Sequence, residues 1–385
     1  MRLQQLLEIF QERKGSDLFI TVGRAPILKV DGRHEPLDDQ PLSVEGAAHL
    51  VDEALNEHQQ ALFAEMHEAN FAIATDEGAR FRVSAFYQRG APGMVIRRIE
   101  TAIPSLESLN LPALIGDLAL TKRGLILFVG GTGTGKSTSL AAMIGRRNAS
   151  APGHILTIED PIEFIHPHQQ CIVNQREVGV DTDSFDTALK NALRQAPDVI
   201  LIGEIRSREI MDYAIAFAET GHLTLATLHA NNANQALDRI INFFPGERRD
   251  QLLMDLSLNL KAVIAQQLIP RADQAGRVAA LEVMLGTPLV QDKIRKGEVH
   301  ALKEIMKASE EQGMQTFDRH LYRLYSGGWI SYESALAYAD SANEVRLMIK
   351  LGADYSADSA EGSEASSEQR GPAAAAVPGF KLVDD

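Results

Sequence analysis

The chain has 385 residues, of which 45% are hydrophobic and 23% charged, which is the composition of an ordinary globular protein. Its formal net charge of −14 argues against nonspecific nucleic-acid binding, and the single cysteine, Cys171, excludes an internal disulfide and a four-thiolate zinc site. The sequence contains no apolar run of about 18 residues, and its acidic, amphipathic start is unlike a signal peptide, so we expect a cytosolic protein without membrane insertion.

The length predicts two domains, each with its own core. The first of them is a small α+β domain over residues 1–100, because short periodic segments alternate there with Gly and Pro turns. The pattern predicts helices over 3–13 and 44–66 and strands over 16–22, 27–30, 71–75, 81–87 and 94–99. Residues 101–113, which contain Pro104 and Pro112, are predicted to form a linker.

Strands and helices alternate from residue 124 onward, which is typical of a doubly wound parallel α/β sheet. Strands are predicted over 125–130, 154–159, 198–202 and 222–228, with helices over 136–147, 185–195 and 207–219 between them. A further long helix is predicted over 247–267, followed by a ribbon and by helices from 287 to 350. We therefore predict a second domain over 114–350 and, from its small and acidic residues, a disordered tail over 351–385.

The most specific motif follows the first of these strands, where the apolar run Leu125–Val129 leads into a glycine-rich segment. Bare backbone N–H groups in such a loop approach phosphate oxygens, and the dipole of the following helix favours the anion. In this phosphate-binding signature, Lys136 supplies a cation to the β- and γ-phosphates of ATP, and the Ser137 hydroxyl ligates Mg²⁺. The predicted nucleotide-binding residues are Gly130, Gly131, Thr132, Gly133, Thr134, Gly135, Lys136, Ser137 and Thr138.

Two further strands deliver acidic residues to the sheet edge at which nucleotides bind. One ends at Glu204, which we expect to polarise the attacking water or to hold Mg²⁺ through a water; the simpler alternative is that it caps the next helix. The other runs into Glu159, Asp160 and Glu163. On their own these three acids would be an ordinary solvated turn, but the neighbouring motifs favour a place in the same site.

A fourth strand has a histidine at each end. His229 falls at the same predicted edge as Glu204 and is in a position to sense the γ-phosphate, although a histidine at a strand end is more often structural. His222 would lie about 23 Å away along a straight strand. We therefore do not expect it to touch the same nucleotide, and a role at an interface fits it better.

The run from Arg80 to Phe86 alternates in polarity, which places Arg80 and Arg82 on one face of a strand, and Arg97 follows on the next strand. One interpretation is a solvated sheet face. The sharper interpretation is that these arginines reach the γ-phosphate in a neighbouring subunit.

Four segments, taken together and in order, resemble the secretion-type traffic ATPases that power bacterial type IV pili and type II secretion: GGTGTGKSTS, ILTIEDPIEFIHPH, DVILIGEIR and TGHLTLATLHANNA. SDLFITVGRAPILKVDG and QQLIPRADQAGRVAALEVM are similar to the retraction group of that family, the PilT and PilU proteins. The resemblance covers residues 1–350. It implies a PAS-like N-terminal domain, a RecA-like P-loop ATPase domain and a ring of six subunits.

The resemblance also implies roles for the residues named above. The phosphate loop would bind ATP with Mg²⁺, and arginines from the N-terminal domain would complete the site. The family's acidic box is matched by Glu159, Asp160 and Glu163, its catalytic glutamate by Glu204, its histidine box by His222 and His229, and its arginines by Arg80, Arg82 and Arg97.

Two departures from PilT favour the accessory, PilU-type branch of the group. The segment Pro288–Glu298 stands where PilT carries an AIRNLIRE motif, and an acidic tail follows residue 350. We therefore expect an ATP-hydrolysing hexameric motor, or accessory motor, for type IV pilus retraction and twitching motility. It would lie in the cytoplasm, peripheral to the inner membrane, with a PilT-like ATPase and an inner-membrane pilus platform protein as partners and no nucleic acid.

Two other functions remain open. One is a non-hydrolysing, nucleotide-binding regulatory subunit of the retraction ring. The other is a secretion or DNA-translocation traffic ATPase, against which the acidic charge and the absence of a basic arm weigh. Phosphate release by the purified protein separates a motor from a silent subunit.

Overall fold

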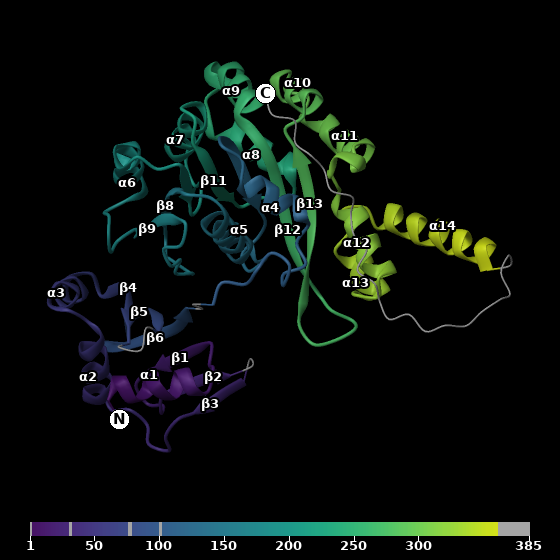
Figure 1. The fold of residues 1–385 in the computed structure, drawn as a ribbon. Coiled ribbons are helices and arrows are strands. Elements are labelled where there is room, and N and C mark those ends of the chain that lie inside the picture. The colour runs from purple at the N-terminus through teal and green to yellow at the C-terminus, as the bar shows by residue number, and fades with distance from the viewer. Residues whose placement is uncertain (1, 31–32, 76–78, 100–101, 361–385) are drawn as a thin grey trace.

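The computed structural model describes residues 2–30, 33–75, 79–99 and 102–360. It contains two sheets, one built from the N-terminal part of the chain and one from the middle, and helices follow the second sheet (Figure 1). The fold class is the one expected, a parallel α/β sheet with a smaller N-terminal α+β unit. None of the helices in the described residues combines the length and apolarity that a membrane span needs.

The N-terminal sheet is antiparallel throughout, in the strand order β3-β2-β1-β6-β5-β4. Its core is closed by the amphipathic helix α1, whose Phe10 packs with its ring centroid 5.2 Å from that of Phe81. The elements are α1 (Leu3–Glu12), β1 (Asp17–Ile20), β2 (Ile27–Val30), β3 (Arg33–Pro36), α2 (Val44–Ala54), α3 (Glu57–Met66), β4 (Glu68–Ala74), β5 (Arg80–Gln88) and β6 (Ala91–Ile99).

The single helix predicted over 44–66 is wrong, because the structure has two helices there, α2 and α3. Leu55 is extended, with φ −95° and ψ 135°, and ends α2. Asn56 then starts α3, since its side chain accepts a hydrogen bond from the backbone N–H of Gln59 at 2.9 Å. The hydrogen bond to the Asn56 side chain favours the start of a new helix over continuation of α2. The apolar periodicity of the segment does not show this break.

The second sheet has the order β13-β12-β7-β11-β10-β8-β9 and is parallel except for the β12–β13 pair. Alternate residues of its interior strand β7 enter different cores: Leu125 and Leu127 face one, and Ile126 and Phe128 face the other. The strands are β7 (Gly124–Val129), β8 (Gly153–Glu159), β9 (Cys171–Glu177), β10 (Val199–Ile202), β11 (Leu223–Leu228), β12 (Leu260–Pro270) and β13 (Arg277–Leu285).

Helices cover both faces of this sheet, as a doubly wound fold requires (Figure 1). The apolar residues of α4 and α5 join the core of Ile126, and those of α6 to α9 join the core of Leu125. The helices are α4 (Ala113–Ala119), α5 (Lys136–Ser150), α6 (Phe185–Ala192), α7 (Arg208–Glu219), α8 (Ala233–Phe243) and α9 (Arg249–Asn259).

Two predictions in this part of the chain differ from the structure. The helix predicted over 247–267 ends at Asn259, and the rest of that segment is β12. Residues 260–270 pair with β7 on one side and β13 on the other, so these tertiary pairings override a sequence that suits either element. The edge strand β9 was not predicted, since polar residues such as Asn174 and Gln175 interrupt its apolar pattern.

The C-terminal helices pack on the face of the sheet that carries α8 and α9, and α14 extends away from the sheet (Figure 1). They are α10 (Pro288–Arg295), α11 (Leu302–Ala308), α12 (Phe317–Ser326), α13 (Tyr332–Ala337) and α14 (Ala342–Ala360). A disordered tail was predicted from residue 351, but α14 continues to Ala360. Residues 361–385 of that prediction lie outside the described residues.

Candidate functional site

The carboxyl ends of three neighbouring parallel strands meet at one edge of the second sheet. Ile202 of β10 pairs with Ile158 of β8 and with Ala226 of β11, so the residues that follow these three come out side by side. Gly203 allows this approach, because a Cβ atom there would stand 3.1 Å from the Cα of Glu159. The hydroxyl of Thr227 donates to the Gly203 carbonyl oxygen at 2.5 Å and ties β11 to β10 at the same level.

The glycine-rich loop between β7 and α5 lies beside this edge, and two of its glycines are required by space as well as by backbone angle. Gly135 has φ +86°, and a Cβ atom on it would lie 2.8 Å from the side-chain nitrogen of Gln266. A Cβ on Gly130 would lie 2.5 Å from the Thr134 hydroxyl oxygen. Gln266 is itself fixed by the Ser139 hydroxyl, which donates to it at 2.8 Å. The loop is therefore a cradle of bare backbone.

Lys136, at the start of α5, lies with its ammonium against the loop. Its Nζ donates to the carbonyl oxygens of Gly130 at 2.8 Å and Gly131 at 2.7 Å. Burial lowers the pKa of Lys136, while the charges of Glu204 and Glu163 oppose this shift. The lysine is thus a buried cation at the N-terminus of a helix, which is the arrangement that attracts phosphate.

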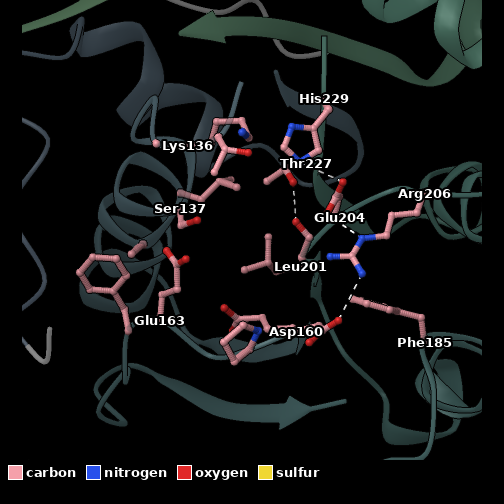
Figure 2. Close-up of a pocket in the computed structure, with 18 of the residues that line it drawn as sticks. Lys136, Ser137, Asp160, Glu163, Phe185, Leu201, Glu204, Arg206, Thr227 and His229 are labelled. Atoms are coloured by element: carbon pink, nitrogen blue, oxygen red, sulfur yellow. Dashed lines mark hydrogen bonds and ion pairs between the residues drawn. The ribbon is translucent and has the colours of Figure 1, made fainter. Parts of the chain in front are cut away.

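These elements surround a cavity of about 310 Å³ that opens between the loop and the strand ends (Figure 2). The cavity brings together most of the residue classes that the sequence predicted: the phosphate loop, the acidic box, the strand-end glutamate, one histidine and one arginine. Its polar and charged lining consists of Arg82, Thr132, Lys136, Ser137, Glu159, Asp160, Glu163, His166, Glu204, Arg206, Thr227 and His229.

Glu204 is held at both of its carboxylate oxygens. Oε1 lies 3.1 Å from Nε2 of His229, and Oε2 accepts a hydrogen bond from Nε of Arg206 at 2.7 Å. Arg206 also reaches Asp160, with its Nη1 3.3 Å from the Asp160 Oδ2 (Figure 2). The hydrogen bond to Glu204 raises the pKa of Arg206, so this guanidinium is a permanent cation between two strand ends.

Glu159 is half-buried at the end of β8. Burial raises its pKa to about 7, although the Thr157 hydroxyl donates to its Oε1 at 2.7 Å and Gln175 donates to the same oxygen at 3.3 Å. Glu159 is therefore partly protonated near neutral pH. That limits the repulsion among the carboxyl groups that line the cavity.

The three predicted arginines lie in different surroundings. Arg82, on β5 of the N-terminal sheet, lines the cavity of its own chain. Arg97 on β6 is in an ion pair, with its Nε 2.8 Å from Oδ1 of the buried Asp17. Arg80 acts electrostatically on Glu177, whose pKa is raised by burial and lowered by this charge. The structure thus brings one of the three to the candidate site.

Six other predicted residues are not among those that line the cavity: Gly130, Gly131, Thr134, Gly135, Thr138 and His222. His222 precedes β11 at the opposite edge of the sheet, and its Nδ1 lies 3.1 Å from the carbonyl oxygen of Phe217. Thr138 lies in the first turn of α5, one residue beyond Ser137. His222 and His229 thus lie at opposite ends of β11.

Several residues at the cavity were missed by the sequence analysis. Arg206 lies within the DVILIGEIR segment, so its charge two residues after Glu204 was a signal that could have been used. His166 is buried, which lowers its pKa to about 4, and belongs to the acidic-box segment. Gln266, which contacts the phosphate loop and does not line the cavity, carried no such signal, because it lies in β12, where a helix was predicted.

Comparison with known proteins gives one consistent result. Residues 66–323 match the model of the type II/IV secretion system protein family. The chain is 65% identical to the type IV pilus ATPase PilU of Pseudomonas aeruginosa, over 93% of this chain and 94% of that protein. It is 40% identical to the type IV pilus retraction ATPase PilT of the same species, over 87% of this chain and 97% of that protein.

A solved structure agrees with these sequence comparisons. The crystal structure of the pilus retraction motor PilT with bound ADP superimposes with a TM-score of 0.85 at 35% identity, covering 90% of this chain and 99% of that one. The resemblance to the retraction group and to its PilU-type branch is thereby confirmed. The chain belongs to the type II/IV secretion system protein family and, within it, to the nucleotide-binding ATPases of type IV pilus retraction.

Proposed function

We propose that this chain is the subunit of a homohexameric ring that hydrolyses ATP to drive or assist type IV pilus retraction in twitching motility. The observation that carries the proposal is the meeting of Lys136, Glu204, His229 and Arg82 at one cavity on the carboxyl edge of a parallel sheet. A fixed cation for the phosphates, a carboxylate for the water and an arginine for the developing charge are the parts that phosphoryl transfer needs.

Each group has one role in this proposal. The backbone of Gly130–Gly135 and the ammonium of Lys136 hold the β- and γ-phosphates, which requires Lys136 to exchange its two loop carbonyls for phosphate oxygens. The Glu204 carboxylate orients the attacking water, and His229 holds that carboxylate. The guanidinium of Arg82 stabilises negative charge on the transferred group.

The residues present also suit magnesium. The Ser137 hydroxyl and the Glu204 carboxylate both line the cavity and are oxygen ligands of the kind that Mg²⁺ prefers; Ser137 would bind it directly and Glu204 through a water. Within the described residues, no group of three or more His, Cys, Asp and Glu is arranged to hold a metal alone. That agrees with an ion which takes its other ligands from phosphate and water and neutralises charge on the phosphates.

The acidic box has a supporting role in the proposal. Asp160 is tied to Arg206, Glu163 contributes negative charge near Lys136, and Glu159 has a raised pKa. Together they would organise the waters around the ion and the γ-phosphate.

We assign residues 1–100 and 114–350 to the two domains of the subunit, with residues 101–113 as the linker. Because the cavity lies between Arg82 of the N-terminal sheet and the loop of the second sheet, movement of one domain relative to the other would open or close the site. The ring would act in the cytoplasm at the inner face of the membrane, on a pilus platform protein and together with a PilT-like ATPase.

The test is phosphate release by the purified full-length chain, measured together with its mass by light scattering, with and without ATP and Mg²⁺. We expect Mg²⁺-dependent release from a particle of six subunits. Tight ATP binding without release would support the non-hydrolysing subunit instead. Co-purification from cells with a PilT-like ATPase and a polytopic membrane protein tests the partners, and their absence from a stable complex would contradict that part.

A further inference from the structure

Arg206 lies four residues after the end of β10 and joins the ends of two neighbouring strands. Its Nε donates to Glu204 at 2.7 Å and its Nη1 lies 3.3 Å from Asp160, a residue that follows β8 (Figure 2). A guanidinium offers several N–H groups in a rigid fork. The single side chain of Arg206 can therefore bridge the carboxylates of two residues that follow different strands. The ammonium of a lysine would be a single flexible point charge in this place.

The simplest account of such a contact is an ordinary surface ion pair. The Arg206 side chain is 54% exposed, and exposed ion pairs contribute little to stability. The stability of the fold therefore gives little reason for this arrangement. The hydrogen-bond partner of Arg206 gives a better reason, because the Glu204 side chain is only 17% exposed and is the carboxylate proposed to orient water.

The two contacts of Glu204 fix the orientation of its carboxylate but do not use all of its hydrogen-bond acceptor positions. His229 holds Oε1 and Arg206 holds Oε2, while an ionised carboxylate has about four acceptor positions. Acceptor positions therefore remain for a water. If the contact to Arg206 is removed, the carboxylate keeps a single side-chain tether at His229 and can rotate about its own χ angles. Displacement of a reacting group by about 1 Å can reduce a rate about 10²-fold.

We propose that Arg206 is a positioning residue for ATP hydrolysis, which sets the orientation of the Glu204 carboxylate by bridging it to Asp160. The proposal rests on the proposed function, and it adds a residue that acts through Glu204 and not by contact with the nucleotide. It also gives the acidic box a mechanical role, since Asp160 anchors the far side of the same guanidinium.

The first experiment measures kcat and KM for ATP of the full-length protein with Arg206→Gln, Arg206→Lys and the control Arg208→Gln. Arg208 lies two residues further on, pairs with Asp212 at 3.5 Å and does not line the cavity. We expect kcat of Arg206→Gln to fall about 10- to 100-fold with KM nearly unchanged. Arg206→Lys should recover part of the loss, because an ammonium reaches only one of the two carboxylates. Arg208→Gln should keep wild-type kinetics.

The second experiment combines Arg206→Gln with Glu204→Gln, and thermal unfolding confirms that every variant is folded. If Arg206 acts through Glu204, the double variant should be hardly slower than Glu204→Gln alone. Fully multiplying losses would overturn the proposal, because Arg206 would then act independently on the substrate. A rise in KM with unchanged kcat, or wild-type kinetics of Arg206→Gln, would overturn it as well. Absence of phosphate release by the wild-type protein would instead overturn the proposed function on which it rests.

Discussion

At the scale of single residues, the position of Lys136 carries the strongest prediction about nucleotide binding. Its ammonium is buried against two loop carbonyls, at the N-terminus of α5. Lys136→Ala should remove ATP turnover and weaken ATP binding, because the β- and γ-phosphates lose their fixed cation. The control is Lys122→Ala, which removes an exposed lysine just before β7. Isothermal titration and phosphate release measure both effects, and normal turnover in Lys136→Ala would refute the phosphate-loop assignment.

A second residue-scale prediction concerns Glu282 on β13, which is buried and accepts a hydrogen bond from the backbone N–H of Ala233 at 2.8 Å. Burial raises the pKa of Glu282 to about 7, with Asp340 and Asp318 raising it further and Lys303 opposing them. The folded state thus binds a proton more tightly than the unfolded state. The stability contributed by this group is present at low pH and is lost as the pH rises from the unfolded pKa toward 7.

Glu282→Gln should remove the dependence of the free energy of unfolding on pH that this group causes. Relative to the wild type, the variant should gain up to about 3 kcal/mol in free energy of unfolding between pH 4.5 and 7.5. The comparison cancels the titration of groups distant from Glu282, such as Glu159. Urea unfolding at several pH values measures the difference, and parallel pH curves for the two proteins would show that Glu282 titrates normally.

At the scale of elements, the phosphate loop depends on the strand beside it. Gly135→Ala would place a methyl group 2.8 Å from the Gln266 side chain, which Ser139 holds in turn. We expect a loss in ATP affinity of at least about 10-fold, because the loop must shift from its cradle. Gly221→Ala is the control: it has φ +99° but open space around it, so it introduces backbone strain alone. Equal ATP affinity for the two variants would contradict a steric role of Gln266.

The same scale shows what the sequence predicts and what it does not. The apolar runs in the sequence predict the strands β7, β8, β10 and β11. The acids, His229 and the phosphate loop come at or just after the ends of these strands in the sequence, and this predicts that they lie at one site. Strand β12 could not be predicted this way, because its pairing with β7 and not its composition decides its structure. The edge strand β9 was not predicted for a related reason: it is defined by its pairing with β8 on one side, while its polar residues interrupt the apolar pattern. The contact of Gln266 with Ser139 could not be predicted, because β12 itself was not predicted. The contact of Arg206 with Asp160 could not be predicted either, because Asp160 follows a strand that is distant in sequence.

At the scale of the whole molecule, the structure places Arg82 at the cavity of its own chain, whereas the sequence predicts arginines that act on a neighbouring subunit. Mixing Glu204→Gln with Arg82→Ala distinguishes the two arrangements. If each site is completed within one chain, every subunit in the mixture keeps a defect and ATPase activity should not recover. Subunit exchange must be demonstrated with a fluorescent label. Recovery would show that Arg82 acts across a subunit boundary, where such arginines contribute about 10³–10⁵ in rate.

The most direct test of the whole account is the ATP hydrolysis rate of Glu204→Gln, measured beside its affinity for radiolabelled ATP. The substitution keeps the shape of the side chain and one acceptor oxygen for Arg206, but removes the carboxylate that orients water. We predict nearly unchanged ATP binding and turnover reduced by about 10²-fold or more. Wild-type phosphate release by this variant would contradict the account, and an equal loss of binding and turnover would make Glu204 a structural residue.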